Sequence, residues 1–179
     1  GWSLGGMLAL RLAHQTTGPL TALVLLASNM KFVRAADWPW ALPGVELEDF
    51  RRAFGDHPSR TQRRFCSLQV QGEADRSLLR RLLAGLHHQP SGLGLDWLRH
   101  WDLRQAWGDL SIPCLALYGT DDALVPAAVQ PQLARLQPAA HMAVYGGGHA
   151  FFWTNAAVLQ RVEAFLCHYL PSGSHRDRP

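Results

Sequence analysis

Five residues at the start of the chain have types and spacing that could perform nucleophilic chemistry. Residues 1–5 (GWSLG) fit the pattern G-x-S-x-G, in which a strand turns sharply into a helix. Such a turn holds the serine in a strained backbone conformation, so the hydroxyl of Ser3 would stand clear of the sheet. Gly1 and Gly5 are expected to be required because a side chain at either position would collide with neighbouring backbone. The pattern predicts Ser3 as a nucleophile and the Leu4 N–H as an oxyanion donor, although a glycine-rich helix start without chemistry would have the same letters.

A second segment, residues 118–126 (YGTDDALVP), continues from an apolar run that is typical of a buried strand. Catalytic groups gather at the carboxyl ends of the strands in open α/β sheets, so an acid at this point could orient a histidine. Asp121 and Asp122 are both candidates, and a solvated turn built from the two aspartates is the alternative interpretation.

The third segment, residues 146–152 (GGGHAFF), places His149 directly after the last predicted strand. Three glycines allow this loop to fold closely over a site, and the two phenylalanines that follow can anchor it. Of the nine histidines in the chain, His149 alone has this setting. The segment therefore predicts His149 as a catalytic base.

The three segments together follow the chain order Ser…Asp…His that is found in α/β-hydrolases. Asp122 is preferred to Asp121 because it lies three residues before Val125, which is the spacing familiar from hydrolases. The predicted chemistry is acyl transfer. His149 accepts the proton of Ser3 as Ser3 attacks an ester carbonyl, and Asp122 holds the imidazole in the correct tautomer.

The apolar pattern predicts the elements that position these residues. A short apolar run typical of a strand buried on both faces of a parallel sheet occurs at 22–27, a further buried strand is predicted at 113–118 and a strand at 141–145, and helical patterns occur at 4–14, 127–136 and 155–169. Between about 36 and 104, tryptophan, arginine and leucine recur at helical spacing without a strand-like run, which predicts about four amphipathic helices.

This order predicts the α/β class, with an α/β-hydrolase fold built from a mostly parallel sheet flanked by helices and interrupted by a helical cap. We place the hydrolase core at 1–35 and 105–171, the cap at 36–104 and a disordered tail at 172–179.

Composition narrows the classes of function. The formal net charge is only +3, which is too small by itself to indicate nucleic acid, and no apolar run is long enough to span a membrane. Cys66, Cys114 and Cys167 are widely spaced among apolar residues, so we expect core residues in a reducing compartment. No Cys/His group has zinc spacing, because the neighbours His87 and His88 cannot share one helix face, and we expect no metal and no cofactor.

Several segments resemble one family of esterases more closely than α/β-hydrolases in general. They are residues 1–6 (GWSLGG), 37–39 (DWP), 60–65 (RTQRRF), 102–105 (DLRQ) and 118–126 (YGTDDALVP). The resemblance is to the pimeloyl-[acyl-carrier-protein] methyl ester carboxylesterases of biotin synthesis, and it extends from residue 1 to about residue 170. It implies a cytoplasmic serine carboxylesterase that hydrolyses the methyl ester of a pimeloyl chain carried on acyl carrier protein.

The resemblance also implies roles for residues outside the triad. Trp2 and Phe65 would line the acyl channel, and the carrier protein would be met by Arg60, Arg64, Arg76 and Arg81. With acyl carrier protein as the partner, we expect no nucleic acid, no membrane contact and a monomer when the protein is full length.

The local charge supports an acidic partner independently of the resemblance. Between residues 57 and 81 the chain has two acids, Glu73 and Asp75, against six arginines: Arg60, Arg63, Arg64, Arg76, Arg80 and Arg81. Acyl carrier proteins are small and acidic, and arginine clusters suit carboxylate and phosphate recognition. The alternative is a solvated helix face whose charge is balanced by acids elsewhere, such as Glu46, Glu48 and Asp49.

Two other functions stay open. Another small-ester, lactone or carbon–carbon bond hydrolase could share residues 1–6 and would need no acidic protein partner. A non-catalytic hydrolase-like binding domain is the second alternative, but binding alone would not require Ser3, Asp122 and His149 together.

The resemblance predicts that the chain lacks the early strands of the family and the loop that supplies the other oxyanion amide. Without the strand that should precede Ser3, the run at 22–27 would become an open apolar sheet edge. We therefore expect residues 1–179 expressed alone to be aggregated or inactive. Size-exclusion chromatography and an esterase assay would check this, and monomeric material with turnover would contradict it.

Overall fold

The computed structural model describes residues 1–16, 18–73, 75, 77–85 and 92–169. Its strands are β1 (Leu23–Leu26), β2 (Cys114–Gly119) and β3 (His141–Tyr145). Its helices are α1 (Leu4–Gln15), α2 (Gly44–Asp56), α3 (Pro58–Gln69), α4 (Ser77–Ala84), α5 (Leu93–His100), α6 (Arg104–Gly108), α7 (Gln130–Leu136) and α8 (Ala156–Tyr169), with a 3-10 turn η1 (Ala127–Val129) before α7. The strands and helices predicted outside 36–104 are all present near their expected bounds, and the tail predicted at 172–179 lies outside the described residues.

The three strands form one parallel sheet in the order β1-β2-β3. All six residues of β2 are buried, as expected for a central strand that is covered on both faces. In β1 only Leu23 and Leu25 are fully buried, so the prediction that this run is buried on both faces is wrong. The reason is position: β1 is an outer strand of the described sheet, and Val24 and Leu26 reach only the margin of an apolar cluster.

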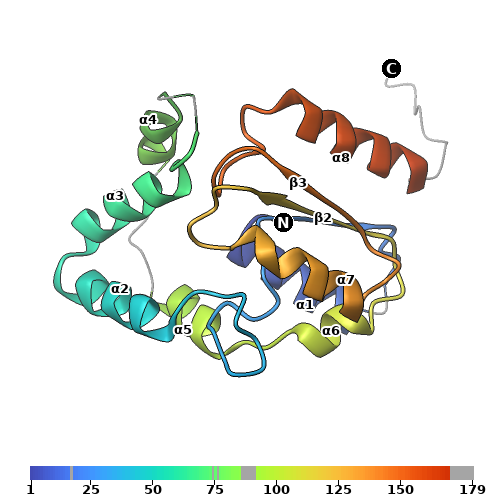
Figure 1. The fold of residues 1–179 in the computed structure, drawn as a ribbon, viewed down its shortest axis with the longest axis horizontal. Helices are drawn as coiled ribbons and strands as arrows, with labels where there is room; N and C mark the ends of the chain where they lie inside the picture. Colours follow the sequence, from blue (N-terminus) through green and yellow to red (C-terminus); the bar gives the residue numbers. More distant parts are fainter. Residues whose placement is uncertain (17, 74, 76, 86–91, 170–179) are drawn as a thin grey trace, which may run out of the picture.

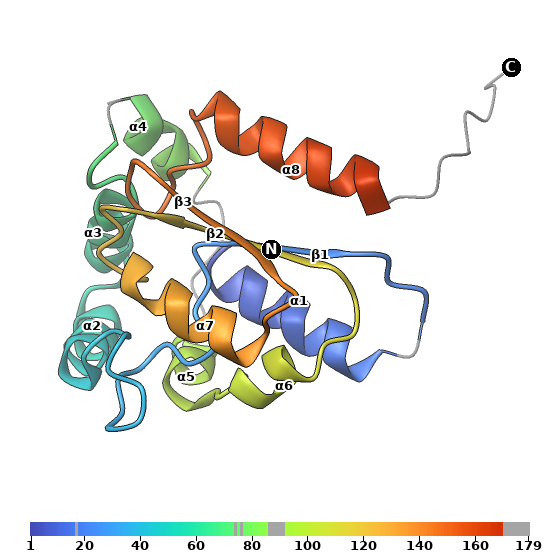
Figure 2. The same cartoon turned by 45° about the vertical axis from the view of Figure 1, so that its right-hand side comes forward.

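Helices cover the two faces of the sheet unequally. Helix α8 lies on one face, and α1, α6 and α7 lie on the other (Figures 1 and 2). The larger core is on the second side, where the indole N–H of the buried Trp107 in α6 donates to the Leu133 carbonyl of α7 at 2.9 Å. The smaller cluster joins Leu117 of β2 to Phe165 of α8. Because apolar side chains cover the sheet on both faces, the ends of its strands are held in place. The loops that carry the candidate site begin at these strand ends.

Four helices, α2 to α5, lie within the span for which a cap was predicted, and they gather to one side of the sheet layers (Figure 1). Helices α2 and α3 pack together through Phe50 and Phe65, whose ring centroids are 5.6 Å apart. The Thr61 hydroxyl donates to the Ala53 carbonyl at 2.8 Å, which adds a polar contact to this apolar one. Over the described residues of this span the number of helices agrees with the sequence pattern, while the division into core and cap stays a prediction.

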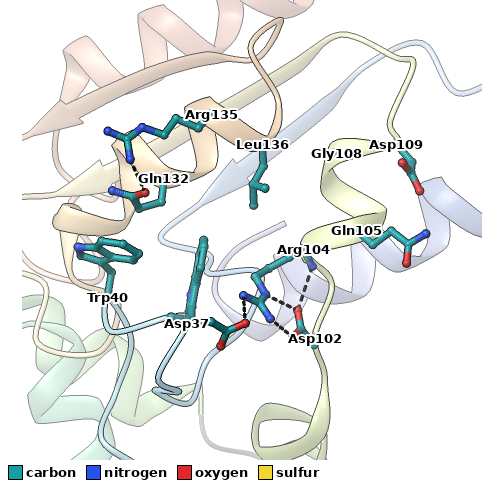
Figure 3. Close-up of a pocket in the computed structure, with 11 residues that line it drawn as sticks. Asp37, Trp40, Asp102, Arg104, Gln105, Gly108, Asp109, Gln132, Arg135 and Leu136 are labelled. Atoms are coloured by element: carbon teal, nitrogen blue, oxygen red, sulfur yellow. Dashed lines mark hydrogen bonds and ion pairs between the residues drawn. The ribbon is translucent and has the colours of Figure 1, made fainter.

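One arginine joins the two places where the chain passes between the helical segment and the rest. Arg104 donates to both carboxylate oxygens of Asp102, at 2.8 and 2.7 Å, and to Asp37 at 2.9 Å (Figure 3). Lys31 also donates to Asp102 at 2.8 Å, and the guanidinium lies 5.2 Å from the ring centre of Trp38. The hydrogen bonds from Arg104 hold the pKa of the Asp102 carboxyl well below its usual range. These contacts lie beside an open groove of about 710 Å³.

This arrangement predicts that Arg104→Lys destabilises the protein. Lysine cannot make the paired contact with Asp102 and reach Asp37 at once, so we expect a loss of about 1 kcal/mol of unfolding free energy for this partly exposed cluster. Urea denaturation of the complete gene product would measure it. Because the lowered pKa makes Asp102 stabilising only while it is ionised, the difference should shrink in strong acid. Arg52→Lys, at an exposed pair, is the control and should change stability by less than about 0.5 kcal/mol.

Candidate active site

The backbone at Ser3 has a conformation that residues other than glycine rarely adopt. Its φ is 53° and its ψ is −126°, and it directly precedes α1. The turn is held from both sides, because Ser3 N donates to the Leu26 carbonyl at 2.9 Å and the Ser3 carbonyl accepts from Gly6 N at 2.9 Å. Strain of this kind costs about 1–3 kcal/mol and persists only where surrounding structure imposes it. The sharp strand-to-helix turn expected from the sequence is therefore present.

The glycines of the turn are required at positions that differ in part from those expected. A Cβ on Gly1 would lie 2.4 Å from the Gly5 carbonyl oxygen, so Gly1 is needed for close packing. Nothing lies within 4 Å of a Cβ built on Gly5, so the expectation that a side chain there would collide is wrong. The crowded position is Gly6 instead, where a Cβ would come 2.0 Å from the Ser28 hydroxyl oxygen.

Ser28 contacts the Ser3 turn, and the sequence did not predict this contact. Its buried hydroxyl lies 2.9 Å from the Ser3 carbonyl oxygen and 3.1 Å from that of Leu26, and it donates toward both. Its own carbonyl accepts from the Tyr118 hydroxyl at 3.2 Å, which connects the turn to the central strand. A signal was available, because Ser28 follows an apolar run and the carboxyl ends of parallel strands meet at one edge of a sheet.

The acid and the histidine are in direct contact. Asp122 Oδ2 lies 2.8 Å from His149 Nδ1, and both side chains are completely buried. The other oxygen, Oδ1, accepts from the backbone N–H groups of Leu124 at 2.8 Å and Val125 at 2.9 Å. Asp121, in contrast, is exposed and accepts from the Thr120 hydroxyl next to it. Of the two neighbouring aspartates, only Asp122 faces the imidazole.

Trp2 connects the Ser3 turn to His149. Its indole N–H donates to the His149 carbonyl at 3.0 Å, and the two ring centroids are 5.5 Å apart. His149 Nε2 is buried and has no hydrogen-bond partner among the described residues, Ser3 included. With Nδ1 bound to Asp122, Nε2 is the nitrogen free to accept a proton, and catalytic contacts of this kind often tighten only when substrate binds.

The remaining predicted residues lie as follows. The Leu4 N–H is in the first turn of α1, where amides have no intrahelical acceptor, so it is free to donate to a ligand. Phe65 packs against Phe50 within the helical segment, and Trp2 packs at 5.4 Å from Phe152. Their roles in binding an acyl chain stay predictions.

The arginines predicted to meet a carrier protein are on two helices. Arg60 and Arg64 are exposed one turn apart on α3. Arg81 of α4 lies 3.7 Å from a carboxylate oxygen of Asp75, and its guanidinium is 5.8 Å from the ring centre of Trp153. Arg76 lies outside the described residues.

The described part of the chain holds no group of three or more His, Cys, Asp or Glu side chains that could bind a metal ion. None of its helices is long and apolar enough to cross a bilayer. Cys66 and Cys114 are buried, and burial raises the pKa of the Cys114 thiol to about 11. Cys167 is exposed, so its prediction as a core residue is wrong: α8 turns it away from the side on which Phe165 is buried.

Comparison with known proteins places the chain in a family. Residues 1–156 match the family described as alpha/beta hydrolase fold. The chain belongs to the α/β-hydrolase family, and the predicted fold class is confirmed. Among solved structures, the bromoperoxidase from Bacillus anthracis matches with a TM-score of 0.79, covering 93% of this chain and 66% of the other. At 19% identity this likeness supports the fold alone.

Curated relatives indicate which members of this family the chain resembles. The chain is 36% identical over 160 residues to the pimeloyl-[acyl-carrier protein] methyl ester esterase of Nitrosomonas europaea and 38% identical over 160 residues to that of Sodalis glossinidius. Both matches cover 85% of this chain, and they cover 64% and 62% of the respective relatives. The resemblance predicted from the sequence segments is therefore confirmed, and the chain spans less than two thirds of the length of these two relatives.

The geometry predicts different costs for the two neighbouring aspartates in the complete gene product. Asp122→Asn should lower kcat for ester hydrolysis by about 10⁴-fold, because an amide cannot stabilise the imidazolium and favours the wrong tautomer. Asp121→Asn is the matched control and should have little effect, since among the described residues the exposed Asp121 side chain is hydrogen-bonded only to the Thr120 hydroxyl. Ser3→Ala should cost roughly four to six orders of magnitude. Steady-state kinetics would measure all three, and a larger loss in Asp121→Asn would overturn the assignment of the acid.

Proposed function

We propose that this chain carries the acyl-transfer chemistry of a carboxylesterase that hydrolyses the methyl ester of pimeloyl-[acyl-carrier protein] in biotin synthesis. The observation that carries the proposal is the buried 2.8 Å contact between Asp122 and His149. It occurs beside the strained Ser3 turn, in a chain 36–38% identical to relatives with this named activity. The sequence identity to these relatives supports the proposed substrate, and the geometry around His149 supports the proposed acyl-transfer chemistry.

The proposed mechanism assigns one role to each of these groups. His149 Nε2, which has no other partner in the described residues, accepts the proton of Ser3 Oγ as that oxygen attacks the ester carbonyl. Negative charge develops on the carbonyl oxygen, where the Leu4 N–H can donate. His149 then returns the proton to the departing methoxide, which leaves as methanol, and water hydrolyses the acyl-enzyme to release the free carboxylate. Asp122 stabilises the imidazolium throughout.

The pairing of charges supports a protein partner at α3. Arg60, Arg63 and Arg64 are exposed and have no ion-pair partner among the described residues. Two of the acids expected to balance them are engaged elsewhere, since Glu48 pairs with Arg99 at 2.9 Å and with Arg51, and Asp49 pairs with Arg52. The alternative of a balanced, merely solvated helix face therefore loses support. Unpaired guanidinium groups are suited to an acidic carrier protein.

The finer features of this function are part of the proposal. Trp2 and Phe65 would contact the pimeloyl chain, with Trp2 adjacent to the histidine and Phe65 on the helix that bears the arginines. Three free cysteines fit the reducing cytoplasm, where the reaction would take place. The carrier-linked substrate requires no oligomer, and we propose a monomer.

The arginines give a test that separates this function from a general esterase. Arg60→Ala combined with Arg64→Ala should raise KM for a carrier-linked ester, and the effect should shrink at high salt because exposed charges are screened over about 8 Å at physiological ionic strength. Hydrolysis of p-nitrophenyl acetate should be nearly unchanged. The measurement is kcat/KM for both substrates, at low and high salt, in the complete gene product.

A matched control removes two exposed arginines elsewhere, Arg52 of α2 and Arg135 of α7, and should leave both substrates unaffected. Equal losses on both substrates in the α3 variant would mean that the arginines only support the helical segment. Full activity on the small ester with no preference for the carrier-linked one would favour a general ester or lactone hydrolase instead.

A further inference from the structure

The loop that contains His149 contacts the end of α3 and the residues that follow it, which are distant from the loop in the sequence. Ala150 N donates to the Gln69 carbonyl at 2.9 Å, and Gly148 N donates to Glu73 Oε1 at 2.7 Å. These two amides belong to the residues on either side of His149. The segment 69–73 therefore contacts the catalytic loop at both of its flanks.

The approach is too close for side chains on the loop. A Cβ on Gly148 would lie 1.9 Å from the Gln71 carbonyl oxygen, and one on Gly147 would lie 2.7 Å from Glu73 Oε1. Gly72 has a φ of 85°, and a Cβ there would lie 2.8 Å from Asp121 Cβ. Gly147 and Gly148 thus permit a specific close contact with the helical segment, whereas nothing lies within 4 Å of a Cβ built on Gly146.

Within this contact, Glu73 makes the only side-chain hydrogen bond to the catalytic loop from segment 69–73. Burial raises the pKa of its carboxyl, and the nearby charge of Asp121 raises it further, against the opposing effect of the Gly148 N–H. Its neighbour Asp75 is directed elsewhere, toward Ser77 N and Arg81. Burial disfavours the charged form of Glu73, and the hydrogen bond from Gly148 N opposes this effect and holds the carboxylate in place.

We propose that Glu73 is a positioning residue that fixes His149 by holding the Gly148 amide, and so couples the helical segment to the catalytic base. The inference rests on the proposed hydrolase function. Three successive glycines leave the loop little intrinsic order, and an imidazole must be placed to within a fraction of an ångström to accept a proton. Asp122 fixes the ring of His149 and Trp2 fixes its carbonyl. Glu73 fixes the backbone that leads into it.

The test compares Glu73→Ala with Glu73→Gln in the complete gene product, using p-nitrophenyl acetate as substrate. Alanine leaves the Gly148 N–H without its acceptor, so we expect kcat to fall by about 10- to 100-fold with little change in KM. Glutamine keeps an acceptor oxygen at the same reach and should restore kcat to near the wild-type value. Glu46→Ala, at an exposed carboxylate on α2, is the control and should match wild type.

Hydrogen–deuterium exchange provides a readout that does not depend on turnover. Glu73→Ala should speed exchange at residues 147–151, while Glu73→Gln should not. Unchanged kcat and unchanged exchange in Glu73→Ala would overturn the inference, as would equal loss of kcat in both variants. A wild-type protein that does not hydrolyse esters would instead refute the proposed function, and the exchange comparison would still decide whether Glu73 holds the loop.

Discussion

The buried hydrogen bond between Asp122 and His149 is the interaction on which the rest of the site depends. Two polar side chains with no solvent exposure are stable inside a protein only when their hydrogen-bonding groups are satisfied. The backbone amides of Leu124 and Val125 satisfy one carboxylate oxygen, and the imidazole satisfies the other. Among the described residues, His149 Nε2 is the only buried side-chain nitrogen or oxygen atom without a hydrogen-bond partner. This unpaired nitrogen is the atom to which the proposed mechanism assigns the proton of Ser3.

Local sequence signals were sufficient for the elements and for the three residues of the proposed triad. The strands at 114–119 and 141–145 coincide with mainly apolar stretches, and the turn at Ser3 is marked by the local pattern of residues 1–5. Asp122 could be preferred to Asp121 from spacing alone, and it is Asp122 that faces the imidazole. These features depend on short-range backbone geometry, which a sequence pattern can express.

Features that depend on distant partners could not be predicted in the same way. Gly6, rather than Gly5, is the crowded glycine because Ser28 approaches it from another strand end. Glu73 reaches an amide 75 residues away, and nothing in the letters around it marks that contact. Cys167 has apolar neighbours, yet it lies two residues after the buried Phe165, which is about 200° around the helix. In each case tertiary packing decided the outcome.

The ion cluster at Arg104 has a mechanical consequence for the helical segment. The guanidinium binds Asp37 and Asp102, which lie close to where the chain passes into and out of that segment, so the two crossings are pinned to one point. This contact resists a movement that would separate the two connections. The segment at 69–73 adds a second anchorage on the histidine loop. Helices α2 to α5 are therefore tied to the rest of the protein at two separate places, and a tilt of these helices would change the contacts of the loop that contains His149.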